Sequence, residues 1–316
     1  MLAAVLLALV STGSCHLSTG DQAWLDRSMD AWNYASTHLS GIGHVRKIEA
    51  IIFDKDCVVT STTAMNGGPN LWTARLHGGQ IQLPDGNKVP VTVTSFAGSD
   101  DKSGTSFFVM STPSIWHAAG KDGKGTTLEN LMTAVMLHEG THVAQMPTYG
   151  QEIGKIAERN HLPDSFGDDS IQAEFGKNSE FTASVERESL LLFNASQART
   201  RPEAARLVRS ALAMMKARQA RWYTGKDSYQ SEAEALWLTL EGSGQWLAYN
   251  WEVDPRGGGV SPSDVLPGFR NDRWWSQREG FAGFMALQRL TGSDWKREAF
   301  HGGGKTIVQM LEEAAR

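Results

Sequence analysis

Two histidines and a glutamate stand close together near the middle of the chain, in the order His138-Glu139-Gly140-Thr141-His142. In an α-helix, residues four apart lie on one face, so both imidazoles could reach one zinc ion at about 2.0–2.1 Å. Glu139 would stand beside the metal, free to accept a proton from a water molecule that attacks a carbonyl group. The residue types and their spacing therefore predict a hydrolytic zinc site.

The residues before this motif predict the helix that it requires. Residues 127–137 contain no proline or glycine, and their apolar members recur with the helical period. Continuing that period places His138 and His142 on the stripe of Leu131 and Val135, which we expect to be buried. Two histidines on a buried stripe could instead be core residues with satisfied nitrogens. Their matched register, with a glutamate between them, favours a metal.

A catalytic zinc site takes a third protein ligand and leaves the fourth position for water. Glu241 is the strongest candidate, and here the chain resembles the glutamate-zincin metallopeptidases (gluzincins), in particular the aminopeptidase-like group. In that group a second helix carries a Trp-Leu-x-Glu-Gly-x-Ala-x-Tyr type segment whose glutamate completes the metal site. Trp237-Leu238, Glu241-Gly242 and Tyr249 match this segment loosely, and Gly244 stands where the family usually has a small residue.

The resemblance implies that His138, His142 and Glu241 bind zinc (Zn²⁺) and that Glu139 is the general base. The chain departs from the best-known members because 99 positions separate His142 from Glu241. That gap leaves other glutamates open as the third ligand, although a solvated helix face is the commoner place for them. These rivals are Glu180, Glu186, Glu188 and Glu234. Glu234 could instead accept a hydrogen bond from a histidine that binds the metal.

Length and charge narrow the class of protein. A chain of 316 residues can bury a substantial core without disulfides or metal. The formal net charge of −5 and the absence of a basic block argue against nucleic acid as a partner, so we expect a peptide or protein substrate.

The N-terminus predicts export. Residues 1–10 form an apolar run much shorter than the roughly 20 residues of a membrane-spanning helix, so residues 1–20 read as a secretory signal. The expected location is the periplasm, the cell envelope or the medium. Small residues before Cys15 resemble a lipoprotein cleavage site, which makes a lipid anchor at Cys15 a further expectation. Cys57 would then be a small buried hydrophobe, with a Cys15–Cys57 disulfide as the lesser alternative.

The order of the expected elements predicts an α+β fold of the zincin type. We expect one domain over residues 21–316, with a mixed or antiparallel sheet in a strand-rich part (45–116) and a mostly helical part (126–316) that carries the metal site. Asp85-Gly86 predicts a hairpin turn. Expected strands cover 50–62, 71–83, 89–96 and 106–115, and expected helices cover 24–39, 127–142, 202–223, 231–251, 274–290 and 305–315.

Two features of the substrate site stay open at this point. Residues 106–112 could be an edge strand along which a peptide binds, or an interior strand with its Phe and Val in the core. A donor to the developing oxyanion could come from any of several side chains: Tyr223, Tyr229, Tyr249, His161 or His301.

The sequence therefore predicts an exported zinc-dependent hydrolase, a peptidase with Glu139 as general base. The alternative keeps the metal without catalysis, as an inactive zinc-stabilised binding or scaffold protein of the cell envelope. Glu139 argues against that alternative, because structural zinc needs no base beside it.

Overall fold

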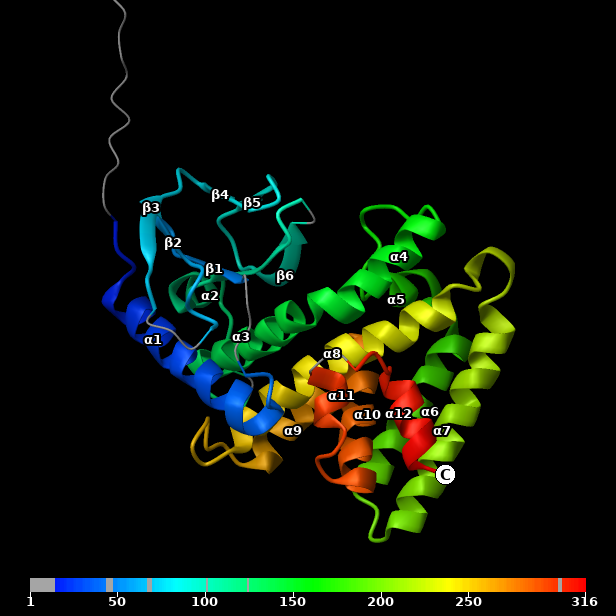
Figure 1. The fold of residues 1–316 in the computed structure, drawn as a ribbon. Coiled ribbons are helices and arrows are strands. Elements are labelled where there is room, and N and C mark those ends of the chain that lie inside the picture. The colour runs from blue at the N-terminus through cyan, green and yellow to red at the C-terminus, as the bar shows by residue number, and fades with distance from the viewer. Residues whose placement is uncertain (1–14, 44–47, 67–69, 101, 124, 301–302) are drawn as a thin grey trace, which may run out of the picture.

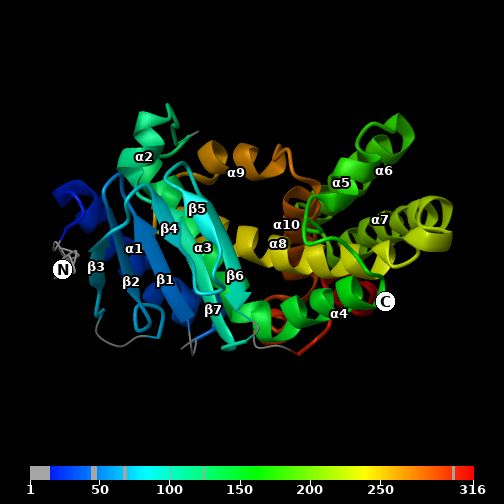
Figure 2. The same cartoon turned by 90° about the horizontal axis from the view of Figure 1, so that it is seen from above.

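A computed structural model describes residues 15–43, 48–66, 70–100, 102–123, 125–300 and 303–316. Its architecture confirms the α+β expectation: a mixed sheet in the N-terminal part precedes a helical C-terminal half. The sheet lies at one end of the molecule and a bundle of helices at the other, and the long helices α3 (Leu128–Gln145) and α8 (Gln230–Val253) run between them (Figures 1 and 2).

The main sheet has five strands in the order β3-β2-β1-β7-β6, and a separate hairpin is formed by β4 and β5. Strands β1 and β7 are parallel to each other, whereas the other neighbours in the main sheet are antiparallel. The bounds are β1 Ile48–Phe53, β2 Cys57–Ser61, β3 Thr73–Leu76, β4 Gln80–Gln82, β5 Lys88–Pro90, β6 Ser95–Asp100 and β7 Thr105–Ser111. The β4–β5 pair confirms the hairpin expected at Asp85-Gly86.

Strand β7 is apolar along its length because both of its faces are covered. Phe108 and Met110 join the main hydrophobic core with the helices, while Phe107 and Val109 pack on the other face with Ile81 of the hairpin. A strand that is buried on both sides reads as a continuous apolar run. Residues 106–112 are therefore interior, and β6 is the edge strand on this side of the sheet.

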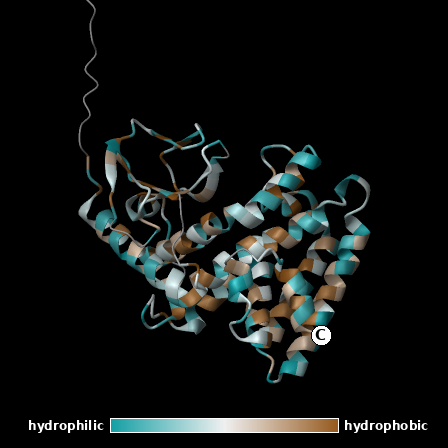
Figure 3. Cartoon of the chain, viewed as in Figure 1, coloured by the Kyte–Doolittle hydropathy of each residue, from teal (hydrophilic) through white to brown (hydrophobic). Residues whose placement is uncertain are grey.

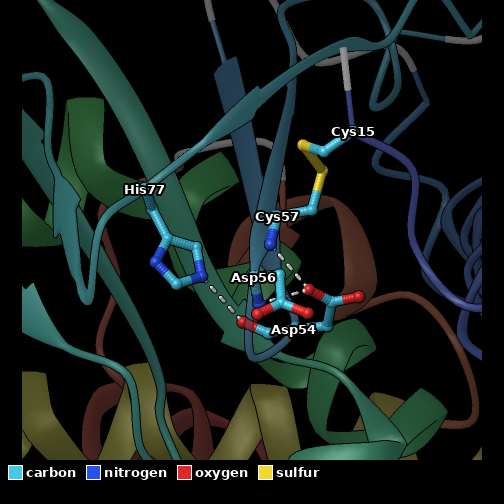
Figure 4. Close-up of a disulfide and its surroundings, with 5 residues drawn as sticks. All are labelled: Cys15, Asp54, Asp56, Cys57 and His77. Atoms are coloured by element: carbon cyan, nitrogen blue, oxygen red, sulfur yellow. Dashed lines mark hydrogen bonds between the residues drawn. A yellow bond between two sulfur atoms is a disulfide. The ribbon is translucent and has the colours of Figure 1, made fainter. Parts of the chain in front are cut away.

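The run expected as one strand over 50–62 is in fact two strands joined by a tight turn. The Asp54 carboxylate accepts hydrogen bonds from the backbone N–H groups of Asp56 (2.9 Å) and Cys57 (2.7 Å). This turn, shown in Figure 4, reverses the chain without a glycine or proline. Because apolar residues lie on both sides of this turn, the apolar pattern of the sequence does not show where one strand ends and the next begins.

Cys15 and Cys57 form a disulfide, with their Cα atoms 5.8 Å apart (Figure 4). The expectations of a free Cys57 and of a lipid anchor at Cys15 are corrected by this pairing. A sulfur in a disulfide cannot also form the thioether of a lipid anchor. The bond ties the segment before α1 to the start of β2.

The helices follow the expected ranges closely. Helix α3 begins after Thr127, whose hydroxyl accepts a hydrogen bond from the Asn130 N–H, and Pro202 lies in the first turn of α7. The other bounds are α1 Thr19–Tyr34, α2 Pro113–Ala118, α4 Gln151–Arg159, α5 Ser170–Phe175, α6 Ser179–Ser196, α7 Arg201–Trp222, α9 Pro262–Arg270, α10 Trp275–Thr291, α11 Lys296–Phe300 and α12 Ile307–Ala314, with π-helical turns at Ala35–Ser40 and Met146–Gly150.

The C-terminal half is held by apolar faces that the helices turn toward one another. Helix α10 packs against α6 and α8, and α12 closes the bundle beside α7. Figure 3 shows hydrophobic residues along these helices and hydrophilic residues over the exposed turns of α4. None of the helices in the described part of the chain combines the length and the apolar character needed to cross a lipid bilayer.

Candidate metal centre

Helices α3 and α8 bring three predicted ligands to one point. His138 and His142 come from α3, and Glu241 comes from the middle of α8, which packs along it. The two imidazole Nε2 atoms are 2.8 Å apart. The Glu241 carboxylate places Oε2 3.2 Å from Nε2 of His138 and Oε1 3.1 Å from Nε2 of His142.

This arrangement fits a tetrahedral metal ion. Ligand atoms about 2.0–2.1 Å from zinc lie about 3.3 Å from one another in a tetrahedral site, close to the three separations above. All three residues are at most 8% exposed. Glu241 Oε2 is buried without a hydrogen-bond partner. A buried carboxylate oxygen without a donor is costly, and a cation between the three side chains would remove that cost.

The two imidazoles also determine the ionisation of the Glu241 carboxyl group. Burial by itself would raise the pKa of the Glu241 carboxyl, but the imidazoles of His142 and His138 outweigh it and hold that pKa well below its usual range. The carboxylate is therefore ionised where the two Nε2 atoms meet. His138, His142 and Glu241 thus form a buried group that could hold a metal ion.

Glu139 is placed beside this group but is not part of it. It is 7% exposed, and burial raises the pKa of its carboxyl to about 7. The charges of Glu241 and Asp168 raise it further, while His138 and a hydrogen bond from Ser95 on strand β6 oppose the rise. A carboxyl group in this condition can accept a proton and return it near neutral pH.

A cavity of about 650 Å³ opens next to His138 and Glu139. Strand β6, helix α3, the second half of α8 and helix α9 contribute to its wall. The lining includes Ser95, Trp116, Leu131, Val135, Gln245, Ala248, Glu252, Val265 and Phe269. A larger cavity of about 890 Å³ between α1, α2 and Arg256 contains none of the predicted ligands. We assign the site to the smaller cavity because it reaches the histidine and the base.

Two glycines allow the helices to approach this closely. A Cβ atom at Gly244 on α8 would lie 2.7 Å from His138 Nδ1. Within the motif itself, a Cβ atom at Gly140 would lie 2.5 Å from the ring of Trp32 on α1. Glycine at both positions is therefore required by packing around the metal helix.

The rival ligands lie elsewhere. Glu188 is fully buried and pairs with Arg218 through Oε2 and Nη2, 2.8 Å apart, so the expectation of a solvated face is wrong for it. Glu186 is exposed, and Glu180 pairs with Arg221 on the surface. Glu234 contacts Arg218 Nη1 at 2.9 Å and accepts a hydrogen bond from Gln219. It therefore holds an arginine and not a ligating histidine.

The side chains left open as oxyanion donors are dispersed. The Tyr223 hydroxyl accepts a hydrogen bond from Arg218, Tyr249 packs against Phe269 and Phe281, and His161 is exposed. Tyr229 stacks edge-on with Phe166, and His301 lies outside the described residues.

Three residues near the centre were not predicted from the sequence. Ser95 comes from the edge of the sheet and Asp168 from the loop before α5. Burial raises the pKa of Asp168 to about 6, and the charge of Glu241 adds to that rise. Neither position carries a motif that could have identified it. Glu252 is different, because it lies three helical turns after Glu241 and almost on the same face of α8.

No family model, no curated protein and no solved structure matches this chain.

Proposed function

We propose that the protein is a zinc-dependent hydrolase of the gluzincin type that cleaves peptide bonds. The observation that carries this proposal is the buried meeting of His138, His142 and Glu241 with a second carboxylate, Glu139, at the wall of an adjoining cavity. Bound zinc would supply a Lewis acid that polarises a carbonyl group.

Each protein residue has a distinct task in this proposal. His138 and His142 provide neutral nitrogen ligands, and Glu241 provides the third ligand and a compensating negative charge. Glu139 accepts the proton of the attacking water and delivers it to the leaving amine. Ser95 lines the cavity together with Glu139, and its hydroxyl would favour the ionised form of that carboxyl group by donating to it.

The edge of the sheet supports a peptide as the substrate. Among the strands that the structure describes, β6 pairs with β7 alone, and its residue Ser95 lines the cavity. A peptide that extends the sheet along β6 would pass the metal centre with its main chain hydrogen-bonded. We also propose that the protein is exported. The Cys15–Cys57 disulfide supports this location, because disulfides persist in oxidising compartments.

The first test is elemental analysis of protein purified without added metal. We expect about one zinc per chain in the wild type and loss of zinc in Glu241→Ala. Glu186→Ala is the matched control, because this exposed glutamate was a rival ligand and should keep the metal. Wild-type protein without zinc, and unable to take it up, would overturn the metal site.

The second test separates an enzyme from a zinc-stabilised scaffold. Zinc-loaded wild type and Glu139→Gln are incubated with a mixture of peptides, and new termini are counted by mass spectrometry. We expect cleavage by the wild type and a loss of about 100-fold or more in the variant at unchanged zinc content. Full zinc occupancy without any cleavage by the wild type would leave the scaffold as the correct description.

A further inference from the structure

The cavity beside the metal centre is lined by several charged side chains, among them Lys121, Asp122 and Asp272, and by one buried carboxyl group that the proposed reaction does not use, Glu252. Glu252 on α8 is 2% exposed and lines this cavity together with His138 and Glu139. Its side chain has no hydrogen bond or ion pair with any described residue. An unpaired buried carboxylate destabilises a fold, so its presence in a cavity wall points to a ligand that completes it.

The position of Glu252 relative to the metal is set by the helix. Glu241, Gln245, Ala248 and Glu252 recur at intervals of four, three and four residues, which places them on one face of α8. The last three of them line the cavity. Eleven residues at 1.5 Å each separate Glu241 from Glu252 by about 16 Å along the axis.

The spacing between Glu241 and Glu252 along α8 determines which cationic group of a substrate could reach Glu252. A free α-amine lies two bonds from the carbonyl carbon of its own residue, so it cannot reach Glu252 while that carbonyl lies at the metal. A lysine or arginine side chain can, because its long stem adds to the roughly 3.3–3.6 Å that each extended residue spans. A second metal ion is not supported, since Glu252 belongs to no cluster of three ligating side chains among the described residues.

The cavity wall between the metal centre and Glu252 suits the methylene groups of a lysine or arginine side chain. Val135, Ala248, Val265 and Phe269 line the cavity with apolar surface. Lysine and arginine bury their methylene groups along apolar surface and present the charge at the end. The backbone that carries Glu252 is held in place, because the N–H groups of Gly258 and Val260 donate to the main-chain carbonyl oxygens of Trp251 and Glu252 and bind the following loop to the end of α8.

We propose that this cavity is a specificity subsite for a lysine or arginine side chain of the substrate, at or near the scissile bond, and that Glu252 is the anion that receives it. The inference rests on the proposed peptidase function for the site. Burial raises the pKa of the Glu252 carboxyl to about 7, and an incoming cation would favour its ionised form.

Cleavage specificity is the first readout. Zinc-loaded wild type, Glu252→Gln and Glu186→Gln are given pairs of peptides that differ only by arginine against citrulline, its neutral isostere. We expect the ratio of kcat/KM for arginine over citrulline to be about 30 or more in the wild type and near one in Glu252→Gln. Glu186 is an exposed glutamate on α6 that does not line this cavity, so Glu186→Gln is the matched control and should keep the high ratio.

Binding without catalysis is the second readout. Isothermal titration of the zinc-loaded protein with Nα-acetyl-arginine amide and Nα-acetyl-citrulline amide is carried out at about pH 8, above the Glu252 pKa of about 7. We expect preference for the cation in the wild type and its loss in Glu252→Gln. Equal binding of both amides by the wild type overturns the subsite. Preferential binding together with no cleavage of any peptide overturns the peptidase function and leaves the subsite standing.

Discussion

Gly244 on α8 faces the imidazole of His138 on α3 so closely that a Cβ atom would lie 2.7 Å from Nδ1 and 3.0 Å from two ring carbons. The two helices can therefore place Glu241 and His138 around one ion only if position 244 has no side chain. The small residue expected there from the family resemblance thus has a physical reason in this chain. It shapes the metal centre without contacting the ion.

Gly244→Ala should weaken metal binding although it favours the helix. The new methyl group must displace the His138 ring, and shifts of this kind in a ligand typically cost about 10–100-fold in metal affinity. Alanine has a higher helix propensity than glycine by about 1 kcal/mol, so the fold need not suffer. Zinc affinity is measured by competition with a chromogenic chelator.

Gly154→Ala is the control for that experiment. Gly154 lies inside α4, and its Cβ position has no atom within 4 Å. This variant should keep the wild-type zinc affinity. If Gly244→Ala also keeps it, the close approach does not position His138.

Gly242 has a different role, although it follows Glu241 directly. A Cβ atom there would lie 2.3 Å from the backbone of Gly280, so α8 and α10 cross with their main chains in contact. Overpacking in a core costs about 1–3 kcal/mol, and here the obstacle is backbone that cannot rotate away. We expect Gly242→Ala to lower the free energy of unfolding of the metal-free protein by at least that amount, measured by urea denaturation.

Gly268→Ala serves as the comparison, because this glycine lies in α9 with open space around its Cβ position. Its free energy of unfolding should stay within about 1 kcal/mol of the wild type. Equal stability of Gly242→Ala and wild type would contradict the close crossing.

The two histidine ligands were predictable because their spacing places both side chains on one face of a helix. His138 and His142 are four positions apart, which is about one helical turn. The period of the preceding residues places both histidines on the stripe of Leu131 and Val135, which is half-buried at the cavity wall, whereas the histidines themselves are buried. Glu241 required a resemblance, since α4–α7 intervene between it and the histidines and periodicity cannot span that gap. The stripe of Glu241, Gln245, Ala248 and Glu252 was present in the sequence, and the same helical period could have identified Glu252.

Other parts of the site and the fold could not be predicted from helical periodicity. Ser95 reaches Glu139 only because β6 is the strand next to β7, and the strand order follows from pairing across distant residues. Asp168 lies in a loop, where no period applies. The turn at Asp54 depends on a side-chain oxygen that replaces the usual glycine. The separation of Cys15 and Cys57 in the sequence does not show whether their Cα atoms come within bonding distance.

The disulfide should stabilise the N-terminal part of the protein. It closes a loop between residues 42 positions apart, which corresponds to about 2–4 kcal/mol of free energy of unfolding. Cys15→Ser is the suitable variant, because Cys15 is half-buried whereas Cys57 is fully buried and would also lose packing. We expect a lower midpoint in urea for the variant. Dithiothreitol should lower the midpoint of the wild type similarly and leave the variant unchanged; a wild type insensitive to reduction would argue against the bond.

Glu252 should also make the stability of the free protein depend on pH. Burial raises the pKa of its carboxyl to about 7 in the folded protein, from its ordinary value of 4.5. Between these values the folded state keeps the proton and the unfolded chain has released it, so the free energy of unfolding falls as the pH rises. The loss amounts to at most about 3 kcal/mol and is complete above pH about 7.

Glu252→Gln removes this titration. The comparison with the wild type therefore separates the contribution of Glu252 to the pH dependence of stability from the contributions of Glu139 and Asp168, whose pKa values are also raised. In urea denaturation of metal-free protein, the variant should gain stability relative to the wild type as the pH is raised from about 5 to about 8. The difference between the two proteins should be small at about pH 5, where the Glu252 carboxyl is protonated in the folded state. A difference that stays constant over this range would mean that the pKa of Glu252 is not raised in the folded protein.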